Sequence, residues 1–245
     1  KRGTFLETRK SSPREYLFVG RFLMYYPIVM DGIKAVIFDI DGTLTTDLSW
    51  VHFTKRIGGS MEENDAAFAN YKSGKIDEAE VTKRVFANWR RSQNPTKAFF
   101  LEVMNEVGIR SDAKEAVDYL KEKGYQLCMI TGSLDLIAEV VGTKLGIEEW
   151  YANTILYWNE DETEMVRMTT ELDENAIKIM QFKNYLEKHG LRAGECVVVG
   201  DSANDIGLFN ITGKGIVVRT EFEAKELEAV AWKKIDNLKE IEGIL

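Results

Sequence analysis

The sequence predicts an α/β fold, in which a parallel sheet is flanked by helices and a small all-helical segment is inserted. Three observations predict it. Short apolar runs alternate with amphipathic helical segments throughout the second half of the chain. A charged, strand-free helical pattern occupies residues 46–108. The chain has 245 residues, 44% of them hydrophobic and 29% charged, which suits a globular core domain with an insertion.

The first strand and the helical insertion come early in the chain. Residues 35–38 form an apolar run, and the turn-prone pair Asp41 and Gly42 ends it. A helical and richly charged pattern follows from residue 46 to residue 108. We therefore expect an α/β core domain made of residues 30–45 and 109–245, with a helical insertion between them.

The first 29 residues differ in composition from the rest. They are rich in basic and aromatic residues, and Met30 lies just before the first strand. Two interpretations stay open: a leader upstream of a native start at Met30, or an N-terminal arm that packs on the core. The apolar portion, residues 16–30, contains Arg21 and lacks a small-residue cleavage site, which argues against a signal peptide. It is also too short to span a bilayer.

Strands and helices alternate after the insertion. The expected elements are a helix from residue 111 to about 123, a strand at 125–130, a helix at 134–145, a hairpin of 154–157 with 164–168, a helix at 175–188, a strand at 196–199, a short helix after Asn204, a strand at 215–218 and a helix–strand pair near Ile235. This order predicts a parallel sheet with helices on both faces.

Charge and cysteine usage exclude several classes of function. The net charge is −8 and no basic run offsets it, so we expect no nucleic-acid partner. Because the apolar N-terminal portion is too short to span a bilayer, we also expect no membrane partner. Cys128 and Cys196 each lie in an apolar run, with neither a CxxC motif nor a His-rich segment nearby. We expect both to be reduced core residues, which fits a cytoplasmic protein. The sequence gives no indication of the oligomeric state.

Acidic residues follow two of the predicted strands. Asp39 and Asp41 come directly after the first strand, two residues apart, and would point the same way if strand geometry continues. Asp201 and Asp205 follow the strand at 196–199. Each pair could instead be solvated turn or N-cap aspartates, although an N-cap role is compatible with metal binding.

A phosphate-binding sequence and a cation complete the predicted site. Thr131 and Gly132 follow the strand at 125–130, and a hydroxyl followed by glycine at a helix N-terminus can hold phosphate oxygens. Strand ends meet at one edge of an α/β sheet, where their carboxylates would suit Mg²⁺. Lys178 or Lys183, both on the helix before the strand at 196–199, would supply the missing cation.

Together these segments resemble the four motifs of the haloacid dehalogenase-like superfamily. The motifs are Phe-Asp-Ile-Asp-Gly-Thr at 38–43, a strand ending in Thr131, a lysine, and Gly-Asp-Ser-Ala-Asn-Asp at 200–205, in the family's order. The resemblance runs from about Ile33 to Leu245, and the second half most resembles the phosphoserine phosphatase-like branch. It implies a Rossmann-like α/β core with a helical cap inserted after the first motif.

The resemblance also implies the roles of the acidic residues. Asp39 would be the nucleophile and a Mg²⁺ ligand. Asp41 would be the general acid and base and would lend its backbone carbonyl to the metal. Asp201 would complete the protein's metal ligands, and Asp205 would lie just behind them.

The remaining roles concern the phosphoryl group. Thr131 and Gly132 would bind its oxygens, and Asn204 would lie near it. Lys178 is favoured as the phosphate-facing lysine by its distance from Gly190, which ends the same helix; Lys183 is the alternative. The resemblance thus implies a Mg²⁺-dependent phosphatase that forms an aspartyl-phosphate on Asp39 and acts on a small phosphorylated metabolite.

The segment after the first motif departs from the phosphoserine enzymes. They place a glutamate there, whereas residues 47–53 contain the aromatic side chains of Trp50 and Phe53 and no glutamate, so phosphoserine specificity does not follow. Trp50, Phe53, Trp89 and Arg90 would either line a pocket for a larger or flatter substrate or pack the cap. Two alternative functions stay open as well: a phosphotransferase or mutase, and a low-turnover regulatory protein that binds a phosphorylated ligand.

Overall fold

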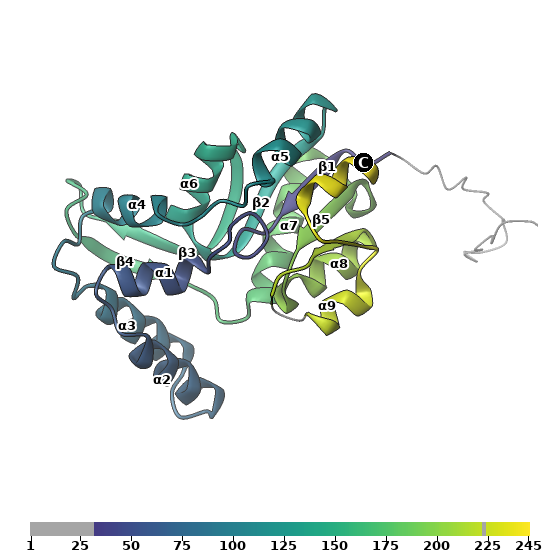
Figure 1. Ribbon diagram of the computed structural model, residues 1–245. Coiled ribbons are helices and arrows are strands. Elements are labelled where there is room, and N and C mark those ends of the chain that lie inside the picture. The colour runs from purple at the N-terminus through teal and green to yellow at the C-terminus, as the bar shows by residue number, and fades with distance from the viewer. Residues whose placement is uncertain (1–31, 222–223) are drawn as a thin grey trace, which may run out of the picture. The chain divides into compact units, whose positions relative to one another are not determined.

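A seven-stranded sheet organises residues 32–221 and 224–245, which are the residues that this computed structural model describes (Figure 1). The strand order is β4-β3-β2-β1-β5-β6-β7, and only β3 and β4 pair antiparallel. The strands are β1 (Ala35–Phe38), β2 (Gln126–Leu134), β3 (Glu149–Trp158), β4 (Met165–Thr169), β5 (Cys196–Gly200), β6 (Gly215–Val218) and β7 (Lys233–Ile235). The predicted α/β fold is confirmed, whereas the leader or arm predicted for residues 1–29 lies outside the described residues.

Helices cover both faces of the sheet because side chains alternate along each strand. Val36 and Phe38 point to the face covered by α5 (Ala113–Glu122) and α6 (Asp135–Leu145). Ala35 and Ile37 point to the opposite face, which packs against the remaining helices. Those helices are α7 (Glu174–His189), α8 (Ile206–Thr212) and α9 (Lys225–Val230).

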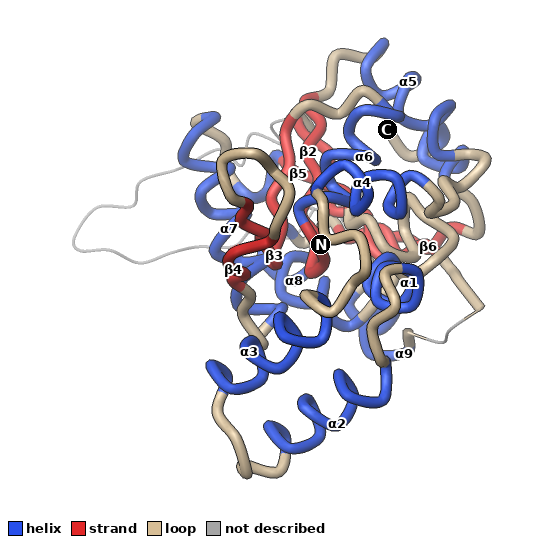
Figure 2. Tube along the Cα trace, turned by 90° about the vertical axis from the view of Figure 1, so that its left-hand side faces the viewer, coloured by secondary structure: helices blue, strands red, loops and turns tan. Residues whose placement is uncertain are grey.

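The insertion is helical, as predicted. Its helices are α1 (Ser49–Arg56), α2 (Met61–Lys72), α3 (Glu78–Trp89) and α4 (Lys97–Asn105). Phe53, Trp89 and Phe100 are fully buried and join the same hydrophobic cluster as β1 and β2. Figure 2 shows α2 and α3 side by side, away from the sheet. The division into a core domain and a cap with the expected boundaries stays a prediction.

Two strand boundaries differ from the prediction. The hairpin of β3 and β4 is present, but β3 begins at Glu149 because its first residues pair in parallel with β2. In turn, β2 continues to Leu134, past the expected end at Ile130. Thr131 and Gly132 therefore lie in an irregular end of the strand, rather than at the start of α6, because β3 provides hydrogen-bonding partners there.

The sheet order brings the predicted motifs together. From β1 the chain builds β2, β3 and β4 on one side and then returns to place β5 on the other side of β1. Such a reversal opens a crevice at the carboxyl ends of the two central strands. The N–H of Asp39 donates to the carbonyl of Val199, 2.9 Å away, so the end of β1 is tied to the end of β5.

Two features of the described residues relate to the predicted cellular environment. Cys128 and Cys196 are both buried, free thiols, as expected. Within the described ranges, no helix has both the length and the apolar character needed to cross a membrane.

Candidate active site

A cavity of about 490 Å³ lies at the carboxyl ends of β1, β2 and β5. Six of the predicted site residues line it: Asp39, Asp41, Thr131, Gly132, Asp201 and Asn204. The other two, Lys178 and Asp205, are fully buried and contact this group. The structure thus brings all eight predicted residues to one place.

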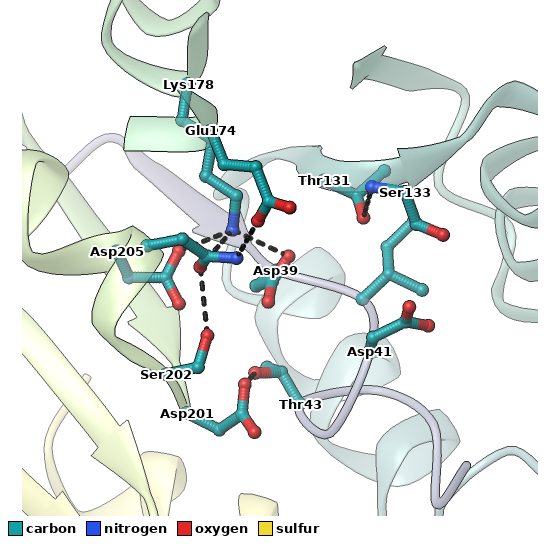
Figure 3. Close-up of polar contacts among 12 residues, drawn as sticks. Asp39, Asp41, Thr43, Thr131, Ser133, Glu174, Lys178, Asp201, Ser202 and Asp205 are labelled. Atoms are coloured by element: carbon teal, nitrogen blue, oxygen red, sulfur yellow. Dashed lines mark hydrogen bonds and ion pairs between the residues drawn. The ribbon is translucent and has the colours of Figure 1, made fainter. Parts of the chain in front are cut away.

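Lys178 reaches the site from α7 (Figure 3). Its Nζ lies 2.9 Å from Oδ1 of Asp39 and 2.8 Å from Oδ1 of Asp205. It also donates a hydrogen bond to Oδ1 of Asn204, at 2.9 Å. Burial alone would lower the pKa of Lys178, but the charges of Asp205 and Asp39 outweigh burial and raise that pKa above its usual value. These carboxylates therefore favour the charged form of Lys178, whereas Lys183 is exposed on another face of α7.

Three carboxylates form a potential metal site beside this lysine. Asp39, Asp201 and Asp205 each offer one oxygen, and these oxygens lie within 4.8 Å of one another. Oδ2 of Asp205 is buried and lacks a hydrogen-bond partner. Oδ1 of Asp39 also lacks one: its 2.9 Å contact with Lys178 is close enough for an ion pair but does not have hydrogen-bond geometry. A buried carboxylate oxygen without a hydrogen-bond partner, such as Oδ2 of Asp205, is what a hard divalent cation would bind.

The electrostatics of the cluster favour a cation as well. Burial, with the charges of Asp39 and Asp205, raises the pKa of Asp201 to about 8. Burial also raises the pKa of Asp205, to about 7, against the opposing effect of Lys178. A bound cation would offset this repulsion and favour the charged carboxylates. Asp205, predicted to lie behind the ligands, thus offers an oxygen to the same cluster as Asp39 and Asp201.

The side chain of Asp41 lies apart from the acidic cluster. Its Oδ2 accepts a hydrogen bond from the hydroxyl of Ser49, at 2.8 Å, and its Oδ1 accepts one from the N–H of Ser49, at 3.1 Å. The Ser49 hydroxyl also contacts that of Ser133, at 2.7 Å. Burial raises the pKa of Asp41 to about 7, although the Ser49 hydroxyl lowers it and the charge of Asp39 raises it. Its carboxyl is thus poised to gain or lose a proton near neutral pH.

Two glycines lie close to acidic side chains of the cavity. Gly42 has a φ of +77°, and a Cβ there would lie 2.1 Å from Oδ2 of Asp201. A Cβ on Gly132 would lie 2.7 Å from Oε2 of Glu174. That same Glu174 oxygen accepts a hydrogen bond from Nδ2 of Asn204, at 2.8 Å. Glu174 therefore fixes the side-chain amide of Asn204 beside Gly132.

Sequence reasoning missed four polar residues of the site. Thr43 donates a hydrogen bond to Oδ1 of Asp201, at 3.4 Å, and its place within the first motif was a signal for a role. Ser133 follows Thr131 and Gly132, and Glu174 lies one helical turn before Lys178, so both could have been found by spacing. Ser49 had no such signal, because its contact with Asp41 depends on how α1 packs.

Four residues of the insertion were expected either to line a pocket or to pack the insertion, and the structure distinguishes these roles. Phe53 and Trp89 are fully buried, with their rings 5.0 Å apart, and pack the insertion. Arg90 pairs with Glu164 and lies outside the cavity lining. Trp50 lines the cavity.

Comparison with known proteins identifies the family. The model of the haloacid dehalogenase-like hydrolase family matches residues 36–210, which is more than half of the chain. The chain therefore belongs to the haloacid dehalogenase-like hydrolase family.

The relatives found by sequence are phosphatases. A phosphoserine phosphatase of Methanocaldococcus jannaschii is 25% identical over 213 residues, which cover 85% of this chain and 95% of that protein. Another, from Campylobacter jejuni subsp. doylei, is 27% identical over 214 residues, covering 85% and 98%. These matches confirm the predicted phosphoserine phosphatase-like branch and the predicted enzyme class, a phosphoric monoester hydrolase.

Solved structures share the fold. One is described as a phospho-aspartyl intermediate analogue of phosphoserine phosphatase; it has a TM-score of 0.66 and 24% identity, with coverage of 88% of this chain and 100% of that chain. A substrate-bound phosphoserine phosphatase complex has a TM-score of 0.67 and 23% identity, with coverage of 88% and 99%. Both support the predicted Rossmann-like α/β core.

Proposed function

We propose that this phosphatase is Mg²⁺-dependent and hydrolyses a small phosphomonoester through an aspartyl-phosphate on Asp39. The observation that carries the proposal is the environment of Asp39. Its carboxylate lines the cavity, contacts the buried cation Lys178, and has an oxygen without a hydrogen-bond partner beside two further carboxylates.

In the first step an oxygen of Asp39 attacks phosphorus and the bond from phosphorus to the leaving oxygen breaks. Asp41 donates its proton to that oxygen, so the leaving group departs as an alcohol. A carboxyl with a pKa of about 7 is protonated in a large fraction of molecules near neutral pH. General acid help of this kind is worth roughly 10²–10⁴-fold in rate.

In the second step the Asp41 carboxylate takes a proton from water, and the water oxygen attacks phosphorus. The bond from phosphorus to Asp39 breaks, which releases inorganic phosphate and restores both side chains. Dividing the reaction in this way replaces one difficult displacement with two easier ones.

The other residues bind and orient the phosphoryl group. Thr131, Gly132 and Asn204 would contact its oxygens, and Lys178 would offset their negative charge. Asp39, Asp201 and the backbone carbonyl of Asp41 would hold Mg²⁺, with Asp205 behind them or as a further ligand. When bound, Mg²⁺ would neutralise phosphate charge and orient the reacting oxygens.

The proposal is tested by p-nitrophenyl phosphate hydrolysis with and without Mg²⁺. We expect turnover that requires Mg²⁺ and is lost in Asp39→Asn. Equal Mg²⁺-dependent rates for wild type and Asp39→Asn would overturn the assigned nucleophile. If the phosphate released equals the substrate consumed, the reaction is hydrolysis rather than phosphoryl transfer to a second substrate. If there is no turnover, a regulatory protein that binds a phosphorylated ligand is favoured.

The expected location remains the cytoplasm, because both cysteines are buried thiols without a disulfide. A small phosphorylated metabolite remains the expected partner.

A further inference from the structure

The cavity has two chemically different walls. The core side presents the carboxylates and polar groups described above. The insertion side presents mainly apolar side chains: Leu48, Trp50, Val51 and Phe68. Leu48 is 48% exposed, so this wall contains apolar surface that nothing in the described residues covers. Apolar surface next to a reaction site is favourable when a ligand covers it.

The aromatic part of this wall is held in place. The ring of Trp50 lies 4.6 Å from that of Trp89, edge-on, and 6.1 Å from that of Phe68. Trp89 is fully buried, and its indole N–H donates to Oγ1 of Thr54, at 3.0 Å. A ring supported from behind loses little conformational freedom when a ligand packs on it, so binding costs less.

The insertion offers little to a small zwitterion. A phosphorylated amino acid would bring a carboxylate and an ammonium group, each needing a charged partner. Among the cavity-lining residues contributed by helices α1–α4 and the residue before them, the charged side chain is Lys72, exposed at the last position of α2. Glu171, in the segment between β4 and α7, and Glu174, the first residue of α7, also line the cavity, and Glu174 is already bonded to Asn204.

We infer that the leaving group of the substrate is flat and apolar, an aromatic alkyl phosphate rather than phosphoserine, and that Trp50 and Phe68 select it. This inference rests on the proposed function, because it assigns what lies on the leaving-group side of the same phosphate site. Trp50 and Phe68 would contact the leaving group only, so they should affect substrates that have a ring and spare those that do not.

The test compares kcat/KM for benzyl phosphate, L-phosphoserine and methyl phosphate in the presence of Mg²⁺. All three release an alkoxide-type leaving group, so differences report contacts with that group. We expect benzyl phosphate to exceed both others by roughly tenfold or more, since apolar burial of a ring is worth at least that factor. Preference for phosphoserine, or equal values for benzyl and methyl phosphate, would overturn the inference.

Substitutions of Trp50 and Phe68 test whether these residues cause the preference for a substrate with a ring. Trp50→Leu and Phe68→Leu should each lower kcat/KM for benzyl phosphate by roughly threefold to tenfold, the range expected for one aromatic contact. Methyl phosphate turnover should fall less than benzyl phosphate turnover, so the ratio of the two kcat/KM values separates loss of the ring contact from a general loss of activity. Phe86→Leu is the matched control, because Phe86 lies on α3 of the same insertion but outside the cavity lining. Equal losses for benzyl and methyl phosphate would contradict a selective role.

The two proposals fail in different ways. If Asp39-dependent turnover of methyl phosphate is present without a preference for the ring, this inference fails and the proposed function stands. If neither the three esters nor p-nitrophenyl phosphate is hydrolysed, both fail.

Discussion

The hydroxyl of Ser49 lies 2.8 Å from Oδ2 of Asp41, and the backbone N–H of Ser49 lies 3.1 Å from Oδ1 of the same carboxyl. Ser49 is the first residue of α1, so the insertion directly holds the side chain proposed to move protons. The position of α1 relative to β1 therefore influences the pKa of Asp41 as well as the shape of the cavity.

Ser49→Ala should move the pH dependence of the reaction. The Ser49 hydroxyl stabilises charged Asp41 and lowers its pKa, so its removal raises that pKa further above about 7. Asp41 must be protonated to act as the acid, and the alkaline limb of kcat/KM should therefore move to higher pH, by roughly half to one pH unit. A pH–rate profile measures this. Ser73→Ala, an exposed serine of the same insertion, should leave the limb in place, and a shift to lower pH in Ser49→Ala would contradict the assignment.

Lys178→Gln should be far more damaging than Lys183→Gln. The first removes a buried cation that contacts Asp39 and Asp205, and we expect kcat/KM to fall roughly 10²–10³-fold. The second removes an exposed charge and should leave kcat/KM within about twofold, because exposed charges contribute little.

Denaturation adds a second measurement for the same pair. In Lys178→Gln the free energy of unfolding should fall by roughly 3–5 kcal/mol at neutral pH without Mg²⁺, because two buried carboxylates lose their counter-charge. Part of the loss should be recovered on acidification, when the carboxylates take up protons. Similar results for both lysine variants would exclude Lys178 from the proposed role.

Gly42→Ala and Gly58→Ala form a matched pair. Both glycines have left-handed backbone, with φ of +77° and +82°, so each substitution should cost roughly 1–2 kcal/mol of stability. Only at Gly42 would the new Cβ collide with Asp201, whereas at Gly58 no heavy atom lies within 4 Å. Gly42→Ala should therefore also raise the Mg²⁺ concentration required for activity, by roughly 10–100-fold. Titrating activity with Mg²⁺ measures this. An unchanged Mg²⁺ requirement in Gly42→Ala would contradict the assignment of Asp201 as a metal ligand.

Because of Asp135, the free energy of unfolding should fall as pH rises. It lies at the start of α6, and burial raises its pKa to about 6 from an ordinary value of 3.8. The folded chain then holds this proton more tightly than the unfolded chain, so stability falls as pH rises from about 4 to about 6 and stays lower above that. The loss amounts to at most roughly 3 kcal/mol.

Asp135→Asn should remove that loss. Relative to wild type, its free energy of unfolding should increase between pH 4 and 6 and then level off, as measured by urea denaturation at several pH values. Asp161→Asn, at an exposed position, serves as the control. A difference between Asp135→Asn and wild type that does not vary with pH would contradict the raised pKa.

The strands of the core were predictable because apolar runs of four or five residues are bounded by turn residues. Residues 35–38, 196–199 and 215–218 all match observed strands to within one residue. The end of β2 was not predictable in this way. Thr131, Gly132 and Ser133 have the composition of a turn, and they extend the strand only because β3 lies alongside.

The acidic residues of the site were predictable because they follow strands that the sheet order brings together. The choice between two lysines depended on the face of α7. Lys178, Phe182 and Tyr185 are spaced as i, i+4 and i+7, so they share the buried stripe, and Lys183 lies off it. Ser49 could not be found from sequence, since its contact with Asp41 arises from tertiary packing alone.

The proposed mechanism requires Asp39 to carry the phosphoryl group during turnover. Its most direct test is to quench the enzyme with acid during turnover of p-nitrophenyl phosphate and Mg²⁺ and to locate the phosphoryl group by peptide mass spectrometry. We expect one phosphoryl group on Asp39 in wild type and none in Asp39→Asn. A phosphoryl group on another residue, or full turnover by Asp39→Asn, would contradict it.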